Sequence, residues 1–440
     1  MHEEPKALLG QALHDSLLHL QPLVTQAVTQ YLVWQKLDGS RWNGEFQPRP
    51  DEIYIFREAD NQIIEASIAF RDSFSIHHPE YHGDIRFLSW QSNWSKFPPR
   101  ILHHALEYLW WQHKSFHLND AQVDAVVEEF SEFVDRRTVR LRFQAQLINF
   151  SMPTDSLALP GCIAIRRLSE KEISEIYGGR IDMLGLFHRR PFGMHEFIVE
   201  GELDEPKILG NEQYEDISIA ANAKVVLDKA IRSLRTFKSG RVGYNYIYCR
   251  PVTFCPLAMS EILGSGDEFI PFGRYSLNLD EYQPLVAHAK LIFACSESVM
   301  ELACTRLADA ENRTRSQDCI IDAVIGMEAM LLSAIGKEER RSELSFRFSL
   351  NFAMLFPPEE RQKAYQLSRD LYNLRSLIAH GASLDEGKVK VAGEKLTLFE
   401  AGKLATNALR TIIFHFLPKG VQYKDPGFWQ RAYLNLSEII

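Results

Sequence analysis

The sequence from about residue 284 onward restricts the fold most narrowly, because its apolar residues recur every three or four positions. This spacing places apolar side chains on one face of a helix, where they can pack against other helices. The longest such segment carries a narrow row suited to a bundle, made of Leu367, Leu371, Leu374 and Ile378. We therefore expect an all-α antiparallel bundle over residues 281–424, followed by a C-terminal tail at 425–440.

Four helices are expected in this bundle before a short hairpin at 388–398 and a last helix at 399–417. The first helix carries a stripe of Ile292, Cys295, Val299 and Leu302. Two successive prolines, Pro357 and Pro358, stop the third helix, because proline lacks the N–H that a helix needs. Pro418 and Gly420 are expected to end the last helix in the same way.

Residues 1–280 show mixed patterns and predict an α+β region. Residues 7–36 have helical spacing, whereas Ile64, Ala66, Ile68 and Phe70 alternate as in a half-buried strand. Strict alternation at 138–147 predicts another strand, with Arg140 and Arg142 on its solvent face. The prolines and the glycine of SMPTDSLALPG mark a sub-boundary near 150–161.

Composition limits the class of protein. A chain of 440 residues can bury two or three separate cores. Its six cysteines form no C-x-x-C pair, which argues against a zinc ribbon and a disulfide framework. The acidic first residues and the lack of a long apolar run favour a cytoplasmic protein without membrane contact.

Charge bears on nucleic-acid binding. The net charge of -9 argues against indiscriminate binding to nucleic acids. Residues 285–420 are nearly neutral, however, with 18 Lys and Arg against 17 Asp and Glu. Contact with nucleic acid in this part of the chain would therefore depend on local basic clusters.

The chain holds three pairs in which four residues separate an arginine from a histidine: Arg190 with His195, Arg375 with His380, and Arg410 with His415. The first pair lies in a stretch with proline and glycine, which predicts a loop. The third lies in an apolar helix. Only the second, in LYNLRSLIAHG, ends a long amphipathic helix with a glycine directly after the histidine, where a helix C-cap prefers it.

This placement has chemical consequences. Positions five apart on a helix lie about 140° apart around its axis, so Arg375 and His380 do not share one face. Fraying at Gly381, or a second copy of the helix in a dimer, would bring both side chains to one phosphate. The negative end of the helix favours a charged histidine, which can act as a general acid or base. The alternative is a histidine that only caps its helix beside a solvated arginine.

The stretch YNLRSLIAHG, at the end of a long helix preceded by two others, resembles the HEPN domain and most closely its Apea-like branch. The resemblance covers about residues 285–420, and CIAIRRLSEKEISEI and LRTFKSGRVGYNYIY resemble stretches found upstream in Apea-like proteins. It implies a metal-independent endoribonuclease without a cofactor, often a dimer with a composite active site, frequently acting as a toxin or in defence against phage. Arg375 and His380 match the catalytic residues of the motif. Ser376 stands where the family often has Asn, Asp or His.

Other charged residues are candidates for supporting roles. Glu328 falls on an apolar stripe, and a buried acid needs a partner. It either orients Arg375 or His380, or forms a structural ion pair with an arginine such as Arg347. The candidates for RNA contact, with an ordinary solvated surface as the alternative, are Arg340, Arg341 and Arg347.

Two questions about the chain stay open at this level. The stretch HHPEYH at 77–82, with Asp84, has the ligand types of a zinc or iron site, but its spacing fits no ligand motif and we predict no metal. Residues 1–280, which are acidic and hold most of the tryptophans, are expected to regulate the nuclease by binding a trigger or inhibitor. The competing hypothesis is a non-catalytic HEPN module for dimerisation or for binding RNA or nucleotides.

Overall fold

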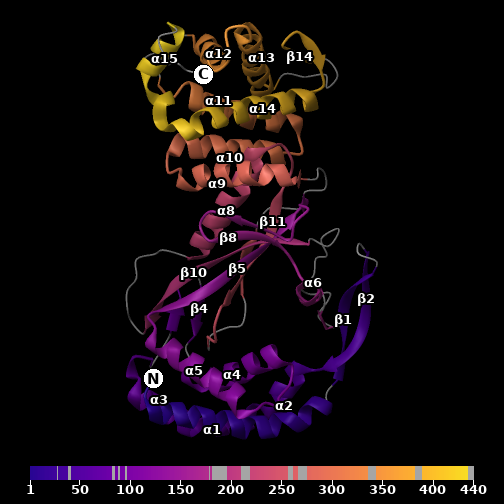
Figure 1. Cartoon of the computed structure of the whole chain (residues 1–440), viewed down its shortest axis with the longest axis vertical. Coiled ribbons are helices and arrows are strands. Elements are labelled where there is room, and N and C mark those ends of the chain that lie inside the picture. The colour runs from indigo at the N-terminus through magenta and orange to yellow at the C-terminus, as the bar shows by residue number, and fades with distance from the viewer. Residues whose placement is uncertain are drawn as a thin grey trace. The chain divides into compact units, whose positions relative to one another are not determined.

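The computed structural model describes residues 1–26, 28–37, 41–81, 85–87, 90–94, 97–177, 179–180, 196–209, 219–255, 261–265, 275–334, 343–381 and 389–434 (Figure 1). Its contacts divide the chain into two compact units. The first comprises Met1–Leu147, Cys162–Leu227 and Tyr244–Glu268, and the second comprises Ile148–Gly161, Asp228–Gly243 and Phe269–Ile440. The second unit thus includes two segments from upstream of the expected bundle.

Five helices form one layer of the first unit (Figure 1): α1 (Glu3–Leu20), α2 (Glu52–Ala66), α3 (Ile68–His77), α4 (Phe97–His113) and α5 (Asp120–Asp135). Short 3-10 turns follow α1 at Gln21–Thr25 and α3 at Pro79–Tyr81. Helix α1 contacts each of the other four helices. Their common core contains fully buried side chains, including Leu13, Phe70 and Phe130. Each such side chain stabilises the fold by about 1.5–3 kcal/mol.

Two sequence predictions for this layer are wrong. The residues from 64 to 70 are not a strand but the end of α2 and the start of α3. Ile64 and Ile68 are 45% and 44% exposed, while Ile63 and Phe70 are buried, so the alternation mixed two faces of a helical segment. The helix predicted over 7–36 ends at Leu20, before Pro22, and a strand follows it.

The main sheet of the first unit has the strand order β12-β11-β5-β10-β3-β4, and β8 also pairs with β10. The pairs of β10 with β3, β5 and β8 are antiparallel. The strands are β3 (Ile85–Phe87), β4 (Trp90–Trp94), β5 (Thr138–Ile148), β8 (Ile163–Arg167), β10 (Phe197–Leu209), β11 (Gly243–Pro251) and β12 (Glu261–Ser265). A smaller antiparallel sheet contains β1 (Val28–Leu37), β2 (Arg41–Pro50) and β9 (Gly179–Arg180). Helix α6 (Glu170–Tyr177) contacts β1.

Strand β5 confirms the alternation predicted for 138–147. Val139, Leu141, Phe143 and Ala145 are all buried. On the other face, Arg140 binds Asp204 of β10, and Arg142 binds Glu202. These cross-strand ion pairs agree with a solvent face for the two arginines rather than a nucleic-acid site.

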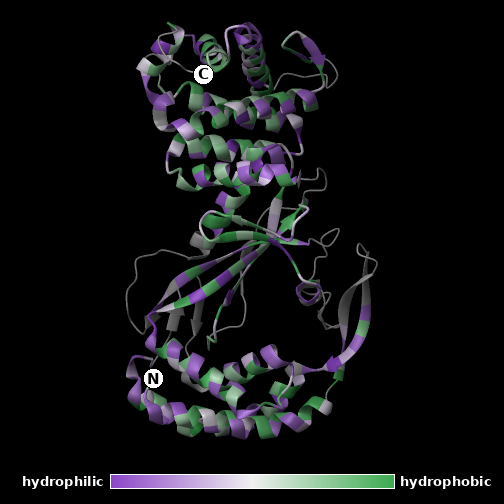
Figure 2. Cartoon of the chain, in the orientation of Figure 1, coloured by the Kyte–Doolittle hydropathy of each residue, from purple (hydrophilic) through white to green (hydrophobic). Residues whose placement is uncertain are grey.

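The second unit is rich in helices, as the sequence predicts. Helix α11 contacts α10, α12, α13 and α14 and is therefore central. A Cβ added to Gly326 of α11 would lie 2.6 Å from Leu409 of α14, so glycine permits this close approach. The helices are α9 (Tyr282–Ala294), α10 (Ser298–Asn312), α11 (Ser316–Leu331), α12 (Leu344–Ala353), α13 (Arg361–Ala379), α14 (Leu398–Phe416) and α15 (Pro426–Tyr433). Hydrophobic and hydrophilic residues alternate along them (Figure 2), as expected of helices with one buried face.

Two details of the second unit differ from the prediction. The expected first helix is two helices, α9 and α10, because the Glu297 carboxylate accepts hydrogen bonds from the backbone N–H groups of Val299 and Met300 and begins α10 there. Residues 426–433 of the expected tail also form a helix, α15. The 3-10 segment Leu417–Lys424 follows α14, and Phe428 and Trp429 of α15 are buried in the helical core.

The upstream segments of the second unit contact its C-terminal part directly. Strand β6 (Phe150–Ser151) pairs in parallel with β13 (Tyr275–Ser276), and β7 (Ser156–Leu159) contacts α9. Helix α8 (Ile219–Phe237) ends in this unit, where Thr236 hydrogen-bonds His288 at 2.7 Å. After α8, Lys238 forms an ion pair with Glu281 at 2.6 Å. The short hairpin of β14 (Val389–Val391) and β15 (Glu394–Leu396) confirms the hairpin prediction.

All six cysteines are free thiols, which agrees with the absence of a predicted disulfide framework. Within the described ranges, none of the helices has the length and apolarity needed to cross a membrane.

Candidate functional site

The candidate site begins with the way α13 is held and ended. Ala364, Ser368, Leu371 and Leu374 are buried at helical spacing, so one face of α13 packs into the core. Asp370 accepts a hydrogen bond from the backbone N–H of Ala392 at 2.9 Å, which ties the helix to the hairpin. The last helical residue is Ala379. His380 is the C-cap, and Gly381 follows in the left-handed region with φ +74°, as LYNLRSLIAHG predicts.

Arg375 lies opposite Glu328 of α11. The guanidinium Nη2 is 3.6 Å from the Glu328 Oε2, a distance that makes an ion pair but is too long for a hydrogen bond. Both side chains are largely covered, with exposed fractions of 31% for Arg375 and 22% for Glu328. Of the partners considered for Glu328, which were Arg375, His380 and an arginine such as Arg347, the structure places Arg375 beside it.

The guanidinium of Arg375 retains unused hydrogen-bonding capacity. Its Nε is buried and has no hydrogen-bond partner among the described residues. A buried N–H without a partner is costly, and a phosphate or carboxylate oxygen would satisfy it. The Nε of Arg375 is therefore a donor that the described residues leave unused, next to Glu328.

The carboxyl group of Glu328 is electrostatically unusual. Burial raises its pKa, and the positive charge of Arg375 lowers the pKa without cancelling that rise. Tyr372, one helical turn before Arg375, responds to the same charges. Burial raises the pKa of its hydroxyl, Glu328 adds to the rise, and Arg375 opposes it. We did not identify Tyr372 from the sequence, although its spacing of three from Arg375 places it on the same side of the helix.

His380 is exposed at the end of the same helix. Its backbone N–H donates to the carbonyl of Ser376 at 3.1 Å. Its imidazole makes no hydrogen bond, ion pair or ring contact with any residue that the structure describes. The structure thus does not bring His380 into contact with Arg375 within one chain, in keeping with the angular offset of five helical positions. The Ser376 side chain is partly covered.

The other basic residues considered for RNA contact lie in different surroundings. Arg340 and Arg341 lie outside the described residues. Arg347 is partly covered on α12, close enough to Tyr433 to influence the pKa of its hydroxyl, which burial raises and Arg347 lowers. A further arginine of the second unit, Arg313, forms an ion pair with Asp322 at 2.6 Å.

Of the two competing arginine–histidine pairs, the described pair, Arg410 and His415, does not form a site. Arg410 is buried and pairs with Glu311, so it belongs to the core of the second unit. Burial lowers the pKa of its companion His415 to about 4, and Lys419 lowers it further. The pair Arg190 and His195 lies outside the described residues.

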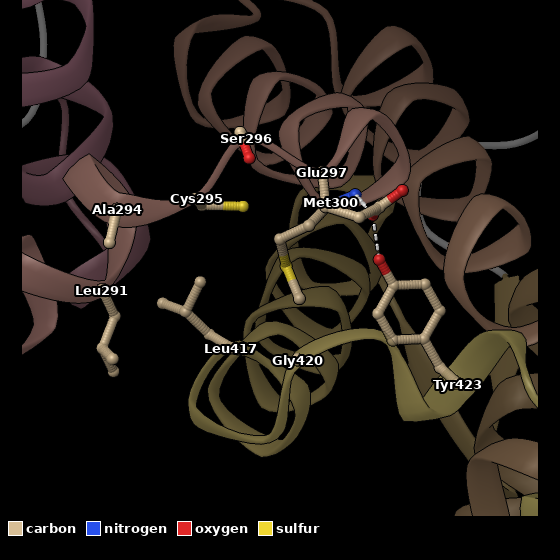
Figure 3. A pocket seen from close by; sticks show the side chains of 9 residues that line it. All are labelled: Leu291, Ala294, Cys295, Ser296, Glu297, Met300, Leu417, Gly420 and Tyr423. Carbon is tan, nitrogen blue, oxygen red and sulfur yellow. Dashed lines mark hydrogen bonds between the residues drawn. The ribbon is translucent and has the colours of Figure 1, made fainter.

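The second unit also contains a small pocket of about 260 Å³, lined by Leu291, Ala294, Cys295, Ser296, Glu297, Met300, Leu417, Gly420 and Tyr423 (Figure 3). Its carboxylate is already used. Burial alone would raise the pKa of Glu297, but hydrogen bonds from Lys424, Tyr423 and the start of α10 lower it to about 2. The pocket includes none of the predicted catalytic residues, and its single acid serves the fold.

A scan against protein-family models and searches of curated proteins and of solved structures found no match for this chain. The chemistry of the site must therefore be inferred from its own residues. These are an arginine with an unused donor, a carboxyl group with a raised pKa, and an exposed histidine at a helix end. Together they can bind an anion and transfer a proton.

Proposed function

We propose that the chain is a metal-independent endoribonuclease of the HEPN type, acting as a regulated toxin or anti-phage effector. The observation that carries the proposal is the arrangement at the end of α13. Arg375 there has an unpartnered buried Nε beside Glu328, and the exposed His380 follows on the same helix. The helix-rich second unit is compatible with such a domain.

RNA supplies its own nucleophile, the 2′-hydroxyl group, so cleavage needs proton transfer and stabilisation of charge on the phosphorus. In the proposed reaction, His380 takes the proton of the 2′-hydroxyl or protonates the departing 5′-oxygen. The 2′-oxygen bonds to phosphorus and the bond to the 5′-oxygen breaks. Arg375 holds the non-bridging oxygens with its planar guanidinium as negative charge develops there. Ser376 can donate a further hydrogen bond to the phosphate.

Glu328 is proposed as a positioning residue that acts through Arg375. Its carboxylate attracts one side of the guanidinium at 3.6 Å and leaves the other donors for the phosphate. Burial raises the pKa of Glu328, and protonation of this group as the pH falls would release Arg375. Tyr372 completes the surroundings of the pair.

The active site is proposed to be composite, formed by two copies of the chain. His380 and Arg375 of one chain make no described contact, and a second α13 would supply the missing partner. Residues 1–280 are proposed to bind a trigger or inhibitor and to restrain the nuclease. Arg347, with Arg340 and Arg341, remains proposed for RNA contact.

A second candidate function is a non-catalytic module for dimerisation or for binding RNA or nucleotides. The observation that favours it is the imidazole of His380, which has no orienting partner among the described residues. Catalytic histidines are usually held by a second group. In this alternative, Arg375 would bind phosphate without cleaving the chain.

The nature of the products distinguishes the two functions. Full-length protein should be incubated with a labelled RNA in EDTA, with DNA of the same sequence as control. The proposed enzyme yields a 2′,3′-cyclic phosphate and a 5′-hydroxyl from RNA and leaves DNA intact, since DNA has no 2′-hydroxyl. The binding module would be supported instead if expression of the protein stopped cell growth while the protein bound the labelled RNA without cutting it.

A further inference from the structure

Two histidines and a glutamate from distant parts of the sequence meet in the first unit. His2 and Glu4 lie at the start of α1, and His77 is the last residue of α3. One possible ligand atom from each residue lies within 4.8 Å of the others. His77 belongs to the stretch HHPEYH. The spacing of residues in that stretch did not indicate the other two members of the cluster, His2 and Glu4. His82 and Asp84 lie outside the described residues.

His77 has its ring oriented for metal binding. Its Nδ1 lies 2.9 Å from the carbonyl oxygen of Ser73, which can only accept a hydrogen bond. The proton of a neutral ring is therefore on Nδ1, and the lone pair is on Nε2. Metal-binding histidines are commonly held by such a bond to a backbone carbonyl. The free Nε2 faces Glu4, whose Oε2 is 3.7 Å away.

His2 contacts His77 through its ring and the neighbouring His78 through its backbone. The two rings stack with centroids 4.1 Å apart, and the backbone N–H of His2 lies 3.5 Å from Nε2 of His78. The His2 Nδ1 accepts the backbone N–H of Glu4 at 3.4 Å, a long and weak hydrogen bond. Breaking this bond costs little, so the His2 ring is able to turn toward an ion.

The Glu4–His77 separation requires only a small closure, whereas the His2 ring, which stacks on His77 at an interplanar angle of 20°, must also turn out of this stack. Bonds of about 2.0–2.1 Å to zinc in tetrahedral geometry separate neighbouring ligand atoms by about 3.4 Å. The Glu4–His77 pair is already near this value at 3.7 Å. The Glu4 side chain is 61% exposed and can move freely.

We propose that His2, Glu4 and His77 bind one Zn²⁺ ion, with water in the fourth position. Two imidazoles and a carboxylate are suitable ligands for this ion. The ion would join the start of α1 to the end of α3 and stabilise the helical layer of the first unit. This role is independent of the proposed nuclease, whose residues belong to the second unit and whose chemistry needs no metal.

Zinc binding can be measured on residues 1–440, prepared with no residues added before Met1 and without a histidine tag. The metal-free protein is titrated with Zn²⁺ against a chromogenic chelator, and its thermal unfolding is recorded with and without the ion. Wild type should bind one more Zn²⁺ than His77→Ala. Glu4→Gln should weaken this site at least tenfold, and zinc should raise the unfolding temperature of wild type but not that of His77→Ala.

His19→Ala is the matched control, because His19 is an exposed histidine of the same helix α1. This variant should bind zinc as wild type does. Equal stoichiometry and affinity in wild type, Glu4→Gln and His77→Ala would overturn the proposal, as would the absence of zinc binding in wild type. Glu4→Gln decides the matter if His77→Ala fails to fold, since the exposed Glu4 side chain is not needed for packing.

Discussion

The carboxylate of Glu328 on α11 lies 3.6 Å from the guanidinium of Arg375 on α13. The pair joins the central helix of the second unit to the helix that ends at His380. It combines a carboxyl group whose pKa is raised by burial with an arginine whose Nε has no described partner. Such an arrangement costs stability in the empty protein and is useful where a charged ligand binds.

Glu328→Gln should make the protein more stable at neutral pH and less active. The folded protein holds the Glu328 proton more tightly than the unfolded chain, so stability present at low pH is lost as pH rises through the raised pKa. Glutamine stays neutral and avoids this loss. Unfolding temperatures at pH 4 and pH 8 test the sign, and an advantage of Gln that shrinks with rising pH would contradict it. RNA cleavage should fall roughly tenfold or more, because Arg375 loses its positioning partner.

Arg410→Ala should destabilise the second unit by about 3–5 kcal/mol, because it leaves the Glu311 carboxylate buried without its partner. Chemical denaturation measures this loss. Because Arg410 is buried, Arg410→Ala is unsuitable as a neutral control for Arg375→Lys. A loss below about 1 kcal/mol would show that Glu311 finds another partner or water.

His288 should make the second unit sensitive to acid. Burial lowers the pKa of His288 to about 4, and the positive charge of Arg410 contributes. Between about pH 6.5 and 4 the unfolded chain binds a proton that the folded protein does not, so stability falls by up to about 1.4 kcal/mol per pH unit. His288→Gln should flatten this part of the stability profile. An unchanged slope would assign the acid sensitivity to other groups.

The sequence predicted the helical elements of the second unit and the end of α13 well, because these depend on local signals. The row from Leu367 to Ile378 defines one face of α13. The backbone at position 381 has a positive φ, which glycine adopts readily, so a glycine suits this position. Glu328 was found because an acid on an apolar stripe needs a partner. Which arginine it meets depends on the packing of α11 against α13, which is a tertiary contact.

The errors also have physical causes. The apolar residues from Ile64 to Phe70 alternate in the sequence, but they lie at exposed and buried positions of two helices. Their two-residue spacing alone was therefore misleading. The division of α9 from α10 depends on the Glu297 side chain as a cap, and the burial of Trp429 in α15 depends on the distant helical core. The assignment of 148–161 to the second unit follows from contacts such as that of β6 with β13, and the assignment of 228–243 from contacts such as that of Thr236 with His288, 52 positions apart. A fragment starting at 281 would therefore lack β7 and Thr236, which contact α9 and His288.

A composite active site predicts complementation between two inactive variants. Arg375→Ala and His380→Ala should each be inactive alone. After the two are unfolded together and refolded, half of the dimers are mixed, and each mixed dimer has one site with both residues intact. Activity should return to about one quarter of wild type. A mixture no more active than its components would show that both residues act within one chain.

The most direct test of the central claim is RNA cleavage in EDTA by wild type, Arg375→Lys and His380→Ala, with Arg369→Ala as control. Arg369 is a 45% exposed arginine of the same helix whose guanidinium lies over the Tyr365 ring. Arg369→Ala should cleave at nearly the wild-type rate. Arg375→Lys should lose about 90% of the activity, because a point charge replaces the planar guanidinium, and His380→Ala about 99% or more. Cleavage by His380→Ala at the wild-type rate, or wild-type activity that EDTA abolishes and zinc restores, would contradict the account.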